Sequence, residues 1–492
     1  MSIRVLIVDD SALMRKLITG ILSVDPAIQI VDTAYNGKDA VEKTHKLKPD
    51  VITMDVEMPI MNGIEAVKAI MATTPVPIVM LSALTTTGAE ITLEALSAGA
   101  VDFICKPSGS ISTDLKTIKE DILLKVKNAA TARIHLRKPQ PGLSSQKIHV
   151  LLVDDSLFVR KTVSDIINKE TDMTVIAEAS NGMEALLKTS MHKPDVIIMD
   201  IDMPEMNGVN ATFQITKEQA TPVIIFSGQA SNHMSDIKLA LEVGAVDFIP
   251  KPTEQMALRT VAPILIKKIR NAHSLKVKKI TSLIGNAITD NILVIGTSTG
   301  GPQTLAELIP QIPADIPAGV LIVQHMPPIF TKSLADRLDS LSAISVREAQ
   351  EGDEILQGEA LIAPGDFHMT VSERIIDGQK KRYVSLNKEE RLHGVRPAVD
   401  ITFSSAANIF GANTVGVLLT GMGRDGANAM GLIKAKGGHT IAQDKQTSII
   451  FGMPAEAIRL GVVDEVLPLN QIAAKAIRAI NSIKQRQVSQ HG

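Results

Sequence analysis

The first part of this 492-residue chain repeats itself without a gap. The pair Asp9-Asp10 returns as Asp154-Asp155, an offset of 145 residues (154 − 9). The same offset relates Asp55 to Asp200, Ser82 to Ser227 and Lys106 to Lys251. Two copies at so long a period do not form a solenoid, so each copy is expected to fold as a domain with its own core.

Each copy alternates short apolar runs with helical patterns, which predicts a doubly wound α/β domain with a parallel sheet covered on both faces. In the first copy the apolar runs are Val5–Val8, Val51–Met54, Ile78–Leu81 and Phe103–Ile104. The repeated polar residues all follow such a run. Because the carboxyl ends of the strands meet at one crevice in this architecture, these residues are expected to lie together.

Three carboxylates at one crevice repel one another unless a cation neutralises them, and an all-oxygen set suits Mg²⁺. In the first copy these carboxylates would be Asp9, Asp10 and Asp55. In a single copy, Asp10 or Ser11 could simply cap the following helix. The recurrence of all the polar positions in a second copy favours a site for a metal and a phosphoryl group.

The motifs VDDS, MDxxMP, the serine at a strand end and the KP pair resemble the two-component receiver domain, end to end in both copies. The resemblance implies that Asp55 and Asp200 accept a phosphoryl group from a histidine kinase. It implies Mg²⁺ in each copy, bound directly by Asp10 and Asp155, supported by Asp9 and Asp154, and completed by main-chain oxygens of Glu57 and Asp202. Ser82 and Ser227 would contact the phosphoryl oxygens, and Lys106 and Lys251 would pair with its charge. Phe103 and Phe248 stand at the aromatic switch position, although both could equally be core residues.

The composition limits the other functions that the chain can have. A formal net charge of −2 gives no general attraction to nucleic acid, and an aromatic content of 2% argues against stacked bases. Cys105 is the only cysteine, so no internal disulfide can form. The chain has no apolar run of about 18 residues and begins with a strand-like segment, which predicts a cytoplasmic protein without membrane insertion.

Linkers divide the chain into three expected domains. We predict receivers at 1–128 and 148–272, connectors at 129–147 and 273–289, and a third domain at 290–488. The first connector is rich in proline, glycine and serine and has no acid. A basic stretch at and just before the second connector contains Lys267, Lys268, Arg270, Lys276, Lys278 and Lys279. It is expected to be a solvated helix end, with a docking face for an acidic partner as the alternative.

The third domain opens with a strand, a glycine-rich turn and a helix, at Asn291–Leu308. The run Ile292–Ile295 reads as a buried strand, and Pro302 suits the first turn of a helix. Between them, Gly296-Thr297-Ser298-Thr299-Gly300 matches G-x-S-x-G, an elbow that presents a serine nucleophile. Such turns also bind phosphate or simply reverse the chain, so the match alone leaves the function open.

A serine nucleophile needs a base and a carboxylate that orients the base. Further strands are predicted at Val320–Val323, Ala360–Ile362 and Val415–Leu419, so His325 and the loop of Asp425 would meet Ser298 at one crevice. The order Ser, His, Asp differs from that of the α/β-hydrolases. His368, His393 and His439 are rival bases, and Asp425 could instead form a turn.

Seven motifs between Ile295 and Ile458, namely IGTSTGG, VQHMPP, IAPGDFHM, HGVRPAVD, LLTGMGRDGA, TIAQD and FGMPAEAI, resemble the catalytic domain of chemotaxis receptor methylesterases. The resemblance implies a Ser298, His325 and Asp425 triad, with backbone near Met422 and Thr299 holding the oxyanion. It implies hydrolysis of glutamate methyl esters on methyl-accepting receptors to glutamate and methanol, deamidation of particular receptor glutamines, and no cofactor in this domain. Arg391, His393 and Arg396 are expected to form surface salt bridges.

Members of the resembled family usually carry one receiver, which covers the catalytic crevice until it is phosphorylated, whereas this chain carries two. The sequence leaves open which receiver gates, which receptor residues are substrates, which kinase donates, how long the phosphoryl group lasts and whether the chain associates. A signalling protein without hydrolysis and a hydrolase of small metabolites are the alternatives.

Overall fold

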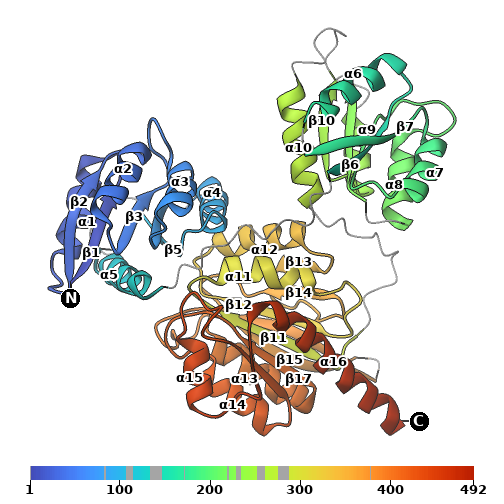
Figure 1. Ribbon diagram of the computed structural model, residues 1–492. Coiled ribbons are helices and arrows are strands. Elements are labelled where there is room, and N and C mark those ends of the chain that lie inside the picture. The colour runs from blue at the N-terminus through green and yellow to red at the C-terminus, as the bar shows by residue number, and fades with distance from the viewer. Residues whose placement is uncertain are drawn as a thin grey trace. The chain divides into compact units, whose positions relative to one another are not determined.

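The computed structural model describes residues 2–82, 85–106, 115–132, 147–170, 172–218, 221–228, 234–251, 261–274, 288–376 and 378–491 (Figure 1). The chain divides into two compact units. One contains the first copy of the repeat together with most of the C-terminal domain, and the other contains the second copy and the short segment Asp339–Ile344. All three domains are built on parallel sheets, which confirms the predicted α/β fold class. Within the described segments, no helix combines the length and the hydropathy needed to cross a bilayer.

The first copy is a five-stranded sheet in the order β2-β1-β3-β4-β5. Its elements are β1 (Ile3–Val8), α1 (Ala12–Leu22), β2 (Ile28–Ala34), α2 (Gly37–Leu47), β3 (Val51–Asp55), α3 (Gly63–Thr73), β4 (Ile78–Ser82), α4 (Thr86–Ser97), β5 (Asp102–Cys105) and α5 (Leu115–Thr131). Adjacent strands are parallel throughout. The sequence prediction missed β2, because this edge strand carries Gln29, Asp32 and Thr33 and therefore does not form an apolar run.

The second copy repeats this topology, in the order β7-β6-β8-β9-β10. Its elements are β6 (Ile148–Val153), α6 (Leu157–Asn168), β7 (Met173–Ala179), α7 (Gly182–His192), β8 (Val196–Met199), α8 (Gly208–Glu218), β9 (Val223–Gly228), α9 (Met234–Glu242), β10 (Asp247–Lys251) and α10 (Ala262–Ser274). The central strand pairs keep their register, because Val150 lies opposite Val196 as Val5 lies opposite Val51. The offset of the sequence repeat is therefore also an offset of the structure.

The C-terminal domain has a seven-stranded parallel sheet in the order β13-β14-β12-β11-β17-β18-β19, and a separate hairpin of β15 and β16. Its strands are β11 (Ile292–Thr297), β12 (Gly319–Gln324), β13 (Ser345–Glu348), β14 (Glu359–Ile362), β15 (His368–Ile376), β16 (Gln379–Asn387), β17 (Thr414–Leu418), β18 (His439–Gln443) and β19 (Glu465–Leu467). Its helices are α11 (Gly301–Leu308), η2 (Ile309–Gln311), α12 (Phe330–Leu341), α13 (Val399–Phe410), η3 (Gly411–Asn413), α14 (Ala427–Ala435), α15 (Met453–Arg459) and α16 (Leu469–His491). In Figure 1, α11 and α12 cover one face of the sheet, and α13 and α14 cover the other. The predicted strands correspond to β11, β12, β14 and β17, whereas the short or polar β13, β18, β19 and the hairpin were not anticipated.

The order of the central strands positions the candidate site. β11 lies between β12 and β17, so the three polar segments that follow these strands are neighbours at one edge of the sheet. Thr297 lies opposite Gln324 in the ladder, and the next residues along each strand are Ser298 and His325. The backbone pairing continues past the strand ends, because Ser298 N–H donates to the Thr420 carbonyl oxygen at 3.0 Å.

Candidate functional site

The first copy gathers its acids at the carboxyl ends of β1 and β3. Asp9, Asp10 and Asp55 each offer an oxygen, and these oxygens lie within 4.8 Å of one another. Lys106 Nζ lies 2.7 Å from Asp55 Oδ2 and 3.0 Å from Asp9 Oδ2. Burial raises the pKa of Asp55 to about 6, although the ion pair with Lys106 opposes this shift. One lysine facing three carboxylates leaves an excess of negative charge, a donor set that fits Mg²⁺.

The second copy forms the same cluster from Asp154, Asp155 and Asp200, again within 4.8 Å. Lys251 Nζ lies 2.7 Å from both Asp154 Oδ2 and Asp200 Oδ2. Burial raises the pKa of Asp200 to about 6, with Lys251 again acting in the opposite direction. Both receivers therefore contain the acid and lysine arrangement that the sequence predicted.

A glycine packs against each candidate phospho-acceptor. A Cβ atom on Gly63 would lie 2.1 Å from the Asp55 carbonyl oxygen, and one on Gly208 would lie 1.8 Å from that of Asp200. No side chain fits at these distances. The glycine of the repeated MNG motif thus lets α3 and α8 begin directly beside the acidic pocket.

The two strand-end serines are buried but bonded differently. Ser82 Oγ accepts a hydrogen bond from Thr92 Oγ1 at 2.6 Å and donates to the Gly88 carbonyl oxygen at 3.2 Å. Ser227 Oγ is buried without a hydrogen-bond partner among the described residues. Glu57 and Asp202, whose main-chain oxygens were predicted to bind the metal, are exposed residues just beyond Asp55 and Asp200.

In the C-terminal domain, the predicted elbow lies between β11 and α11. All of Ile292–Thr297 is buried, Gly300 has a left-handed φ of 78°, and Pro302 stands in the first turn of α11. Ser298 lies in the turn, and a Cβ atom on Gly421 would lie 2.9 Å from Ser298 Cβ. The Gly421-Met422 segment therefore borders the serine closely, and Met422 is 38% exposed.

His325 and Asp425, which were predicted to be the base and the carboxylate that orients it, lie in contact. His325 Nε2 lies 2.8 Å from Asp425 Oδ2, and Asp425 is only 2% exposed. Burial by itself raises the pKa of the Asp425 carboxyl, but hydrogen bonds from His325 and from the backbone N–H groups of Asp400 and Val399 bring it below its ordinary value. The Asp425 carboxylate is thus ionised and bonded to the His325 ring. In the described structure the Ser298 hydroxyl makes no hydrogen bond to this ring.

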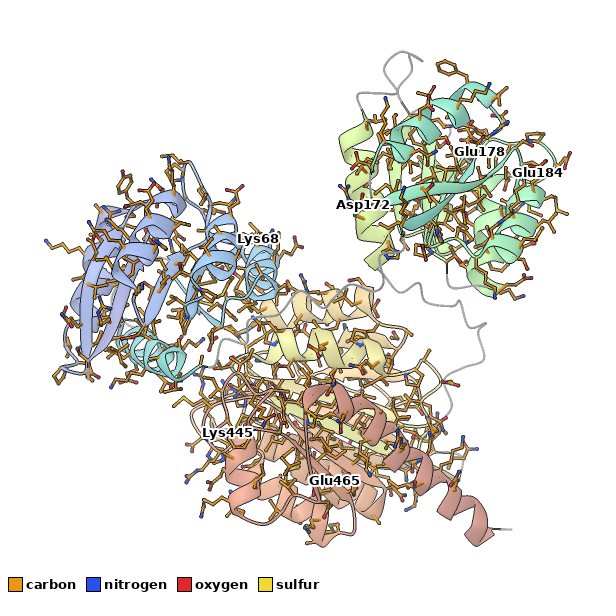
Figure 2. The ribbon with its side chains drawn as sticks, in the orientation of Figure 1. Lys68, Asp172, Glu178, Glu184, Lys445 and Glu465 are labelled. Carbon is orange, nitrogen blue, oxygen red and sulfur yellow. The ribbon has the colours of Figure 1, made fainter. Side chains whose placement is uncertain are left out.

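The rival histidines have other partners. His368 is fully buried, where Nδ1 accepts from Ala398 N–H and Nε2 donates to the Glu390 carbonyl oxygen, so both ring nitrogens are occupied. His439 begins β18, at the end of the strand away from Ser298, and pairs at 2.8 Å with Glu465, which Figure 2 labels. His393 bonds Asp400 instead of Ser298. This leaves His325 as the histidine that follows a strand beside β11.

One residue at the site was not anticipated. Gln324 ends β12 and is buried, and its Nε2 donates to the carbonyl oxygens of Ser298 at 2.9 Å and His325 at 3.2 Å. This amide joins the two segments that carry Ser298 and His325. A Cβ atom on Gly301 would lie 1.8 Å from Gln324 Oε1, so the second glycine of the TGG motif makes room for this amide. The available signal was a lone polar side chain at the end of an apolar run.

The first receiver contacts the C-terminal domain directly beside Ser298, the candidate nucleophile. Thr299 Oγ1 donates to Asp102 Oδ2 at 2.7 Å, and Gln303 Nε2 donates to the carbonyl oxygens of Leu96 and Ala100. Phe103 stacks on Phe330 with ring centroids 4.4 Å apart. These contacts join α4 and β5 of the receiver to the starts of α11 and α12, the helices that follow the strands bearing Ser298 and His325.

The described part of the basic stretch is engaged within the second receiver. Arg270 pairs with Glu170 at 2.7 Å and with Asp172 at 2.8 Å (Figure 2), and Lys268 pairs with Asp247 at 2.5 Å. The rest of the basic stretch, Lys276, Lys278 and Lys279, lies outside the described residues. So does most of the first predicted connector, at 133–146. In the C-terminal domain, Arg396 forms the expected salt bridge, to Asp366 at 2.6 Å. The exposed Arg391 lies 3.8 Å from the same acid.

Comparison with known proteins matches each of these parts. A profile of the CheB methylesterase family matches residues 293–476, and one of the response regulator receiver domain matches residues 5–116 and 150–262. The protein-glutamate methylesterase/protein-glutamine glutaminase of Symbiobacterium thermophilum is 36% identical over 479 residues, covering 97% of both chains. That of Methanococcus maripaludis is 36% identical over 481 residues, covering 98% of this chain and 99% of its own. The crystal structure of the Thermotoga maritima CheB methylesterase catalytic domain is 46% identical over 39% of this chain and 99% of its own, with a TM-score of 0.37.

Two receivers joined to an α/β domain with a serine elbow and a histidine–aspartate pair define a response regulator with a hydrolase-like effector. The long matches to complete relatives make the assignment more specific. The chain belongs to the CheB family of protein-glutamate methylesterases/protein-glutamine glutaminases, in a form with two receivers.

Proposed function

We propose that this protein is a phosphorylation-regulated esterase that hydrolyses glutamate methyl esters on methyl-accepting chemotaxis receptors and deamidates receptor glutamines. The pair of His325 and Asp425, 2.8 Å apart at the sheet edge where β11 presents Ser298, is the observation that carries this proposal. The names of the relatives, protein-glutamate methylesterase/protein-glutamine glutaminase, support the choice of substrate.

The proposed reaction is acyl transfer through Ser298. Its Oγ attacks the side-chain carbonyl carbon of the substrate, and His325 takes the proton. Because Nε2 of His325 faces Asp425, Nδ1 is the ring nitrogen left for the serine. Methanol then leaves with this proton, or ammonia when the substrate is glutamine, and water hydrolyses the acyl-serine to release glutamate. The lack of a hydrogen bond between Ser298 and His325 is compatible with this reaction, because in hydrolases the bond between serine and base often tightens only when substrate binds.

Negative charge on the substrate oxygen needs donors that face the nucleophile. Backbone at Thr299 and Met422 is proposed for this role. Two observations support it: Thr299 directly follows Ser298 at the start of the turn, and Gly421 packs against the serine Cβ. Asp425, which remains ionised, stabilises the imidazolium that forms on His325.

Asp55 and Asp200 are proposed to accept phosphoryl groups from a chemotaxis histidine kinase. Mg²⁺ would be held by Asp9, Asp10 and Asp55 with the Glu57 carbonyl oxygen, and by Asp154, Asp155 and Asp200 with that of Asp202. When bound, the ion would screen the carboxylates from the incoming phosphoryl oxygens. Ser82 and Ser227 would hydrogen-bond these oxygens, and Lys106 and Lys251, already beside the acids, would pair with their charge.

We assign the gating role, which the sequence left open, to the first receiver. Its Asp102 bonds the residue next to the nucleophile, and its Phe103 stacks on the first residue of α12. Both residues belong to β5, whose last residue directly precedes Lys106 of the acidic pocket. Phosphorylation of Asp55 would act on Lys106 and from there on β5, loosening the contact that restricts access to Ser298.

Replacing the nucleophile tests the proposed reaction. In Ser298→Ala, methanol release from methylated receptor should fall at least about a thousandfold, because the substitution removes the hydroxyl that is proposed to attack the ester. The matched control is Ser372→Ala, which removes a hydroxyl bonded within the β15–β16 hairpin and should leave the rate unchanged. Retention of activity in a folded Ser298→Ala protein would refute the proposed function.

A further inference from the structure

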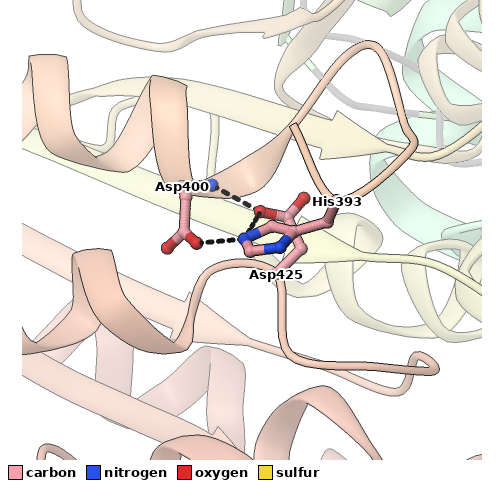
Figure 3. A group of neighbouring side chains, drawn as sticks. All are labelled: His393, Asp400 and Asp425. Atoms are coloured by element: carbon pink, nitrogen blue, oxygen red, sulfur yellow. Dashed lines mark hydrogen bonds and ion pairs between the residues drawn. The ribbon is translucent and has the colours of Figure 1, made fainter. Parts of the chain in front are cut away.

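A second histidine and a second aspartate lie against the carboxylate of the proposed triad. His393, Asp400 and Asp425 offer ligand atoms within 4.8 Å of one another (Figure 3). His393 Nε2 lies 2.9 Å from Asp400 Oδ2 and 4.0 Å from Asp425 Oδ1. Because an ionised carboxylate only accepts, Nε2 of His393 carries the hydrogen. The same N–H therefore faces both carboxylates.

The N-terminus of α13 fixes the orientation of Asp425. Its Oδ2 accepts from Val399 N–H at 2.7 Å as well as from His325, and its Oδ1 accepts from Asp400 N–H at 2.9 Å. The Asp400 side chain is itself fixed, because Oδ1 accepts from Ala429 N–H of α14 at 2.9 Å. Asp400 thus presents its backbone to the Asp425 carboxylate and its side chain to His393.

Two buried carboxylates this close together repel each other. Asp425 is 2% exposed and Asp400 is 6% exposed, so solvent screens the repulsion poorly. The hydrogen bond from His393 satisfies Asp400 Oδ2, the oxygen that otherwise has no donor among the described residues. The His393 side chain is only 19% exposed, and its backbone has a left-handed φ of 56°, which non-glycine residues seldom adopt. The loop therefore holds this imidazole in place at a conformational cost.

We propose that His393 is a positioning residue for Asp425. Its N–H donates to Asp400 and lies 4.0 Å from Oδ1 of Asp425, so it holds the two acids together at the start of α13 and keeps Oδ2 of Asp425 directed at His325. This role rests on the proposed Ser298, His325 and Asp425 triad. It assigns a function to the only rival histidine that lies beside this triad, and it extends the catalytic arrangement to the loop before α13.

Two substitutions in the full-length protein test the role. His393→Leu keeps the bulk and loses the donor, so kcat for methyl ester hydrolysis should fall about ten- to a hundredfold with KM unchanged, as for a small misplacement of a catalytic group. His393→Gln retains an N–H of similar reach and should recover most of this loss. His439→Leu, which breaks a comparable histidine–carboxylate pair at the end of β18 away from Ser298, should leave kcat unchanged.

Diisopropyl fluorophosphate separates this proposal from a purely structural role and from the proposed function. Its reaction with Ser298 forms an Oγ–P bond, releases fluoride and sends the serine proton to the base, so the rate per folded molecule measures activation of the nucleophile. This rate should fall in His393→Leu in parallel with kcat. An unchanged rate, or no recovery in His393→Gln, would overturn the positioning role while Ser298→Ala remained inactive. An active Ser298→Ala would instead overturn the proposed function.

A double-mutant cycle adds an independent criterion. Asp400→Asn keeps an acceptor for Ala429 N–H but removes the charge that repels Asp425 and binds His393. In this background His393→Leu should cost little further activity, because the two side chains act as one unit. Fully additive losses would show that His393 acts independently of Asp400, contrary to the proposal.

Discussion

The two receivers have the same strand order, the same acid cluster and the same lysine, yet corresponding residues of β5 and β10 have different partners. In the first receiver Asp102 pairs with Lys125 of its own domain at 3.5 Å and also accepts a hydrogen bond from Thr299. Phe103 is 3% exposed because it stacks on Phe330. In the second receiver the equivalent Asp247 pairs with Lys268 of its own domain, and Phe248 is partly exposed. Matching acidic pockets therefore do not imply matching contacts. Under the proposed gating, the output of a receiver depends on what the last strand of its domain contacts.

The sharpest test of this difference removes each phospho-acceptor in turn. With acetyl phosphate as donor, Asp55→Asn should lose essentially all stimulation of esterase activity, because the first receiver contacts the residue next to Ser298. Asp200→Asn should keep most of the stimulation and serves as the matched control. If Asp200→Asn is the variant that loses stimulation, the assignment of the gate is wrong and the contacts of β5 have another purpose.

The pockets themselves should behave alike. Burial raises the pKa of both Asp55 and Asp200 to about 6, so each carboxylate is ionised and free to bind a cation above that pH and protonated below it. Mg²⁺ affinity should therefore weaken about tenfold between pH 7 and pH 5 in both receivers, as protons compete for the ligand. Titration of Asp200→Asn and Asp55→Asn proteins with Mg²⁺ at several pH values measures each site separately. A clear difference between the two curves would place part of the functional divergence in the pockets.

The smallest effect is expected from the aromatic pair. Phe103→Ala removes a stacked contact worth about 0.5–1.5 kcal/mol beyond its buried area, so the basal esterase rate should rise about two- to tenfold. Phe248→Ala, at the same place in the repeat, should leave the basal rate unchanged. The rates are measured without phosphodonor, with circular dichroism to confirm folding. An equal rise in both variants would mean that the stack on Phe330 does not restrict the site.

The sequence predicted most of what depends on local pattern. Apolar runs located the central strands, and the order of α/β elements then placed Ser298, His325 and Asp425 at one edge of the sheet. The edge strand β2 and the β15–β16 hairpin were not predicted, because their alternating polar residues resemble those of an exposed loop. The strands that were found are those whose burial on both faces requires continuous apolar residues.

Contacts between distant residues could not be predicted in this way. Asp102 and Thr299 are 197 positions apart, and no sequence pattern around either residue predicts that they are in contact. His393 was one of several histidines with no distinguishing pattern, and its position against Asp400 depends on the conformation of the loop before α13. Gln324 was detectable in principle, as a polar residue that ends a buried strand. The role of its amide could be inferred only from the structure, which shows the two carbonyl groups that it joins.

The glycines that lie against the two proposed phospho-acceptors offer a way to inactivate either receiver without altering its charge. A methyl group at Gly63 or Gly208 would overlap a carbonyl oxygen, so α3 or α8 would have to move away from the pocket. Every acid and the lysine would remain chemically intact. Alanine alleles at these positions could thus inactivate one receiver at a time in cells without changing the net charge of the protein.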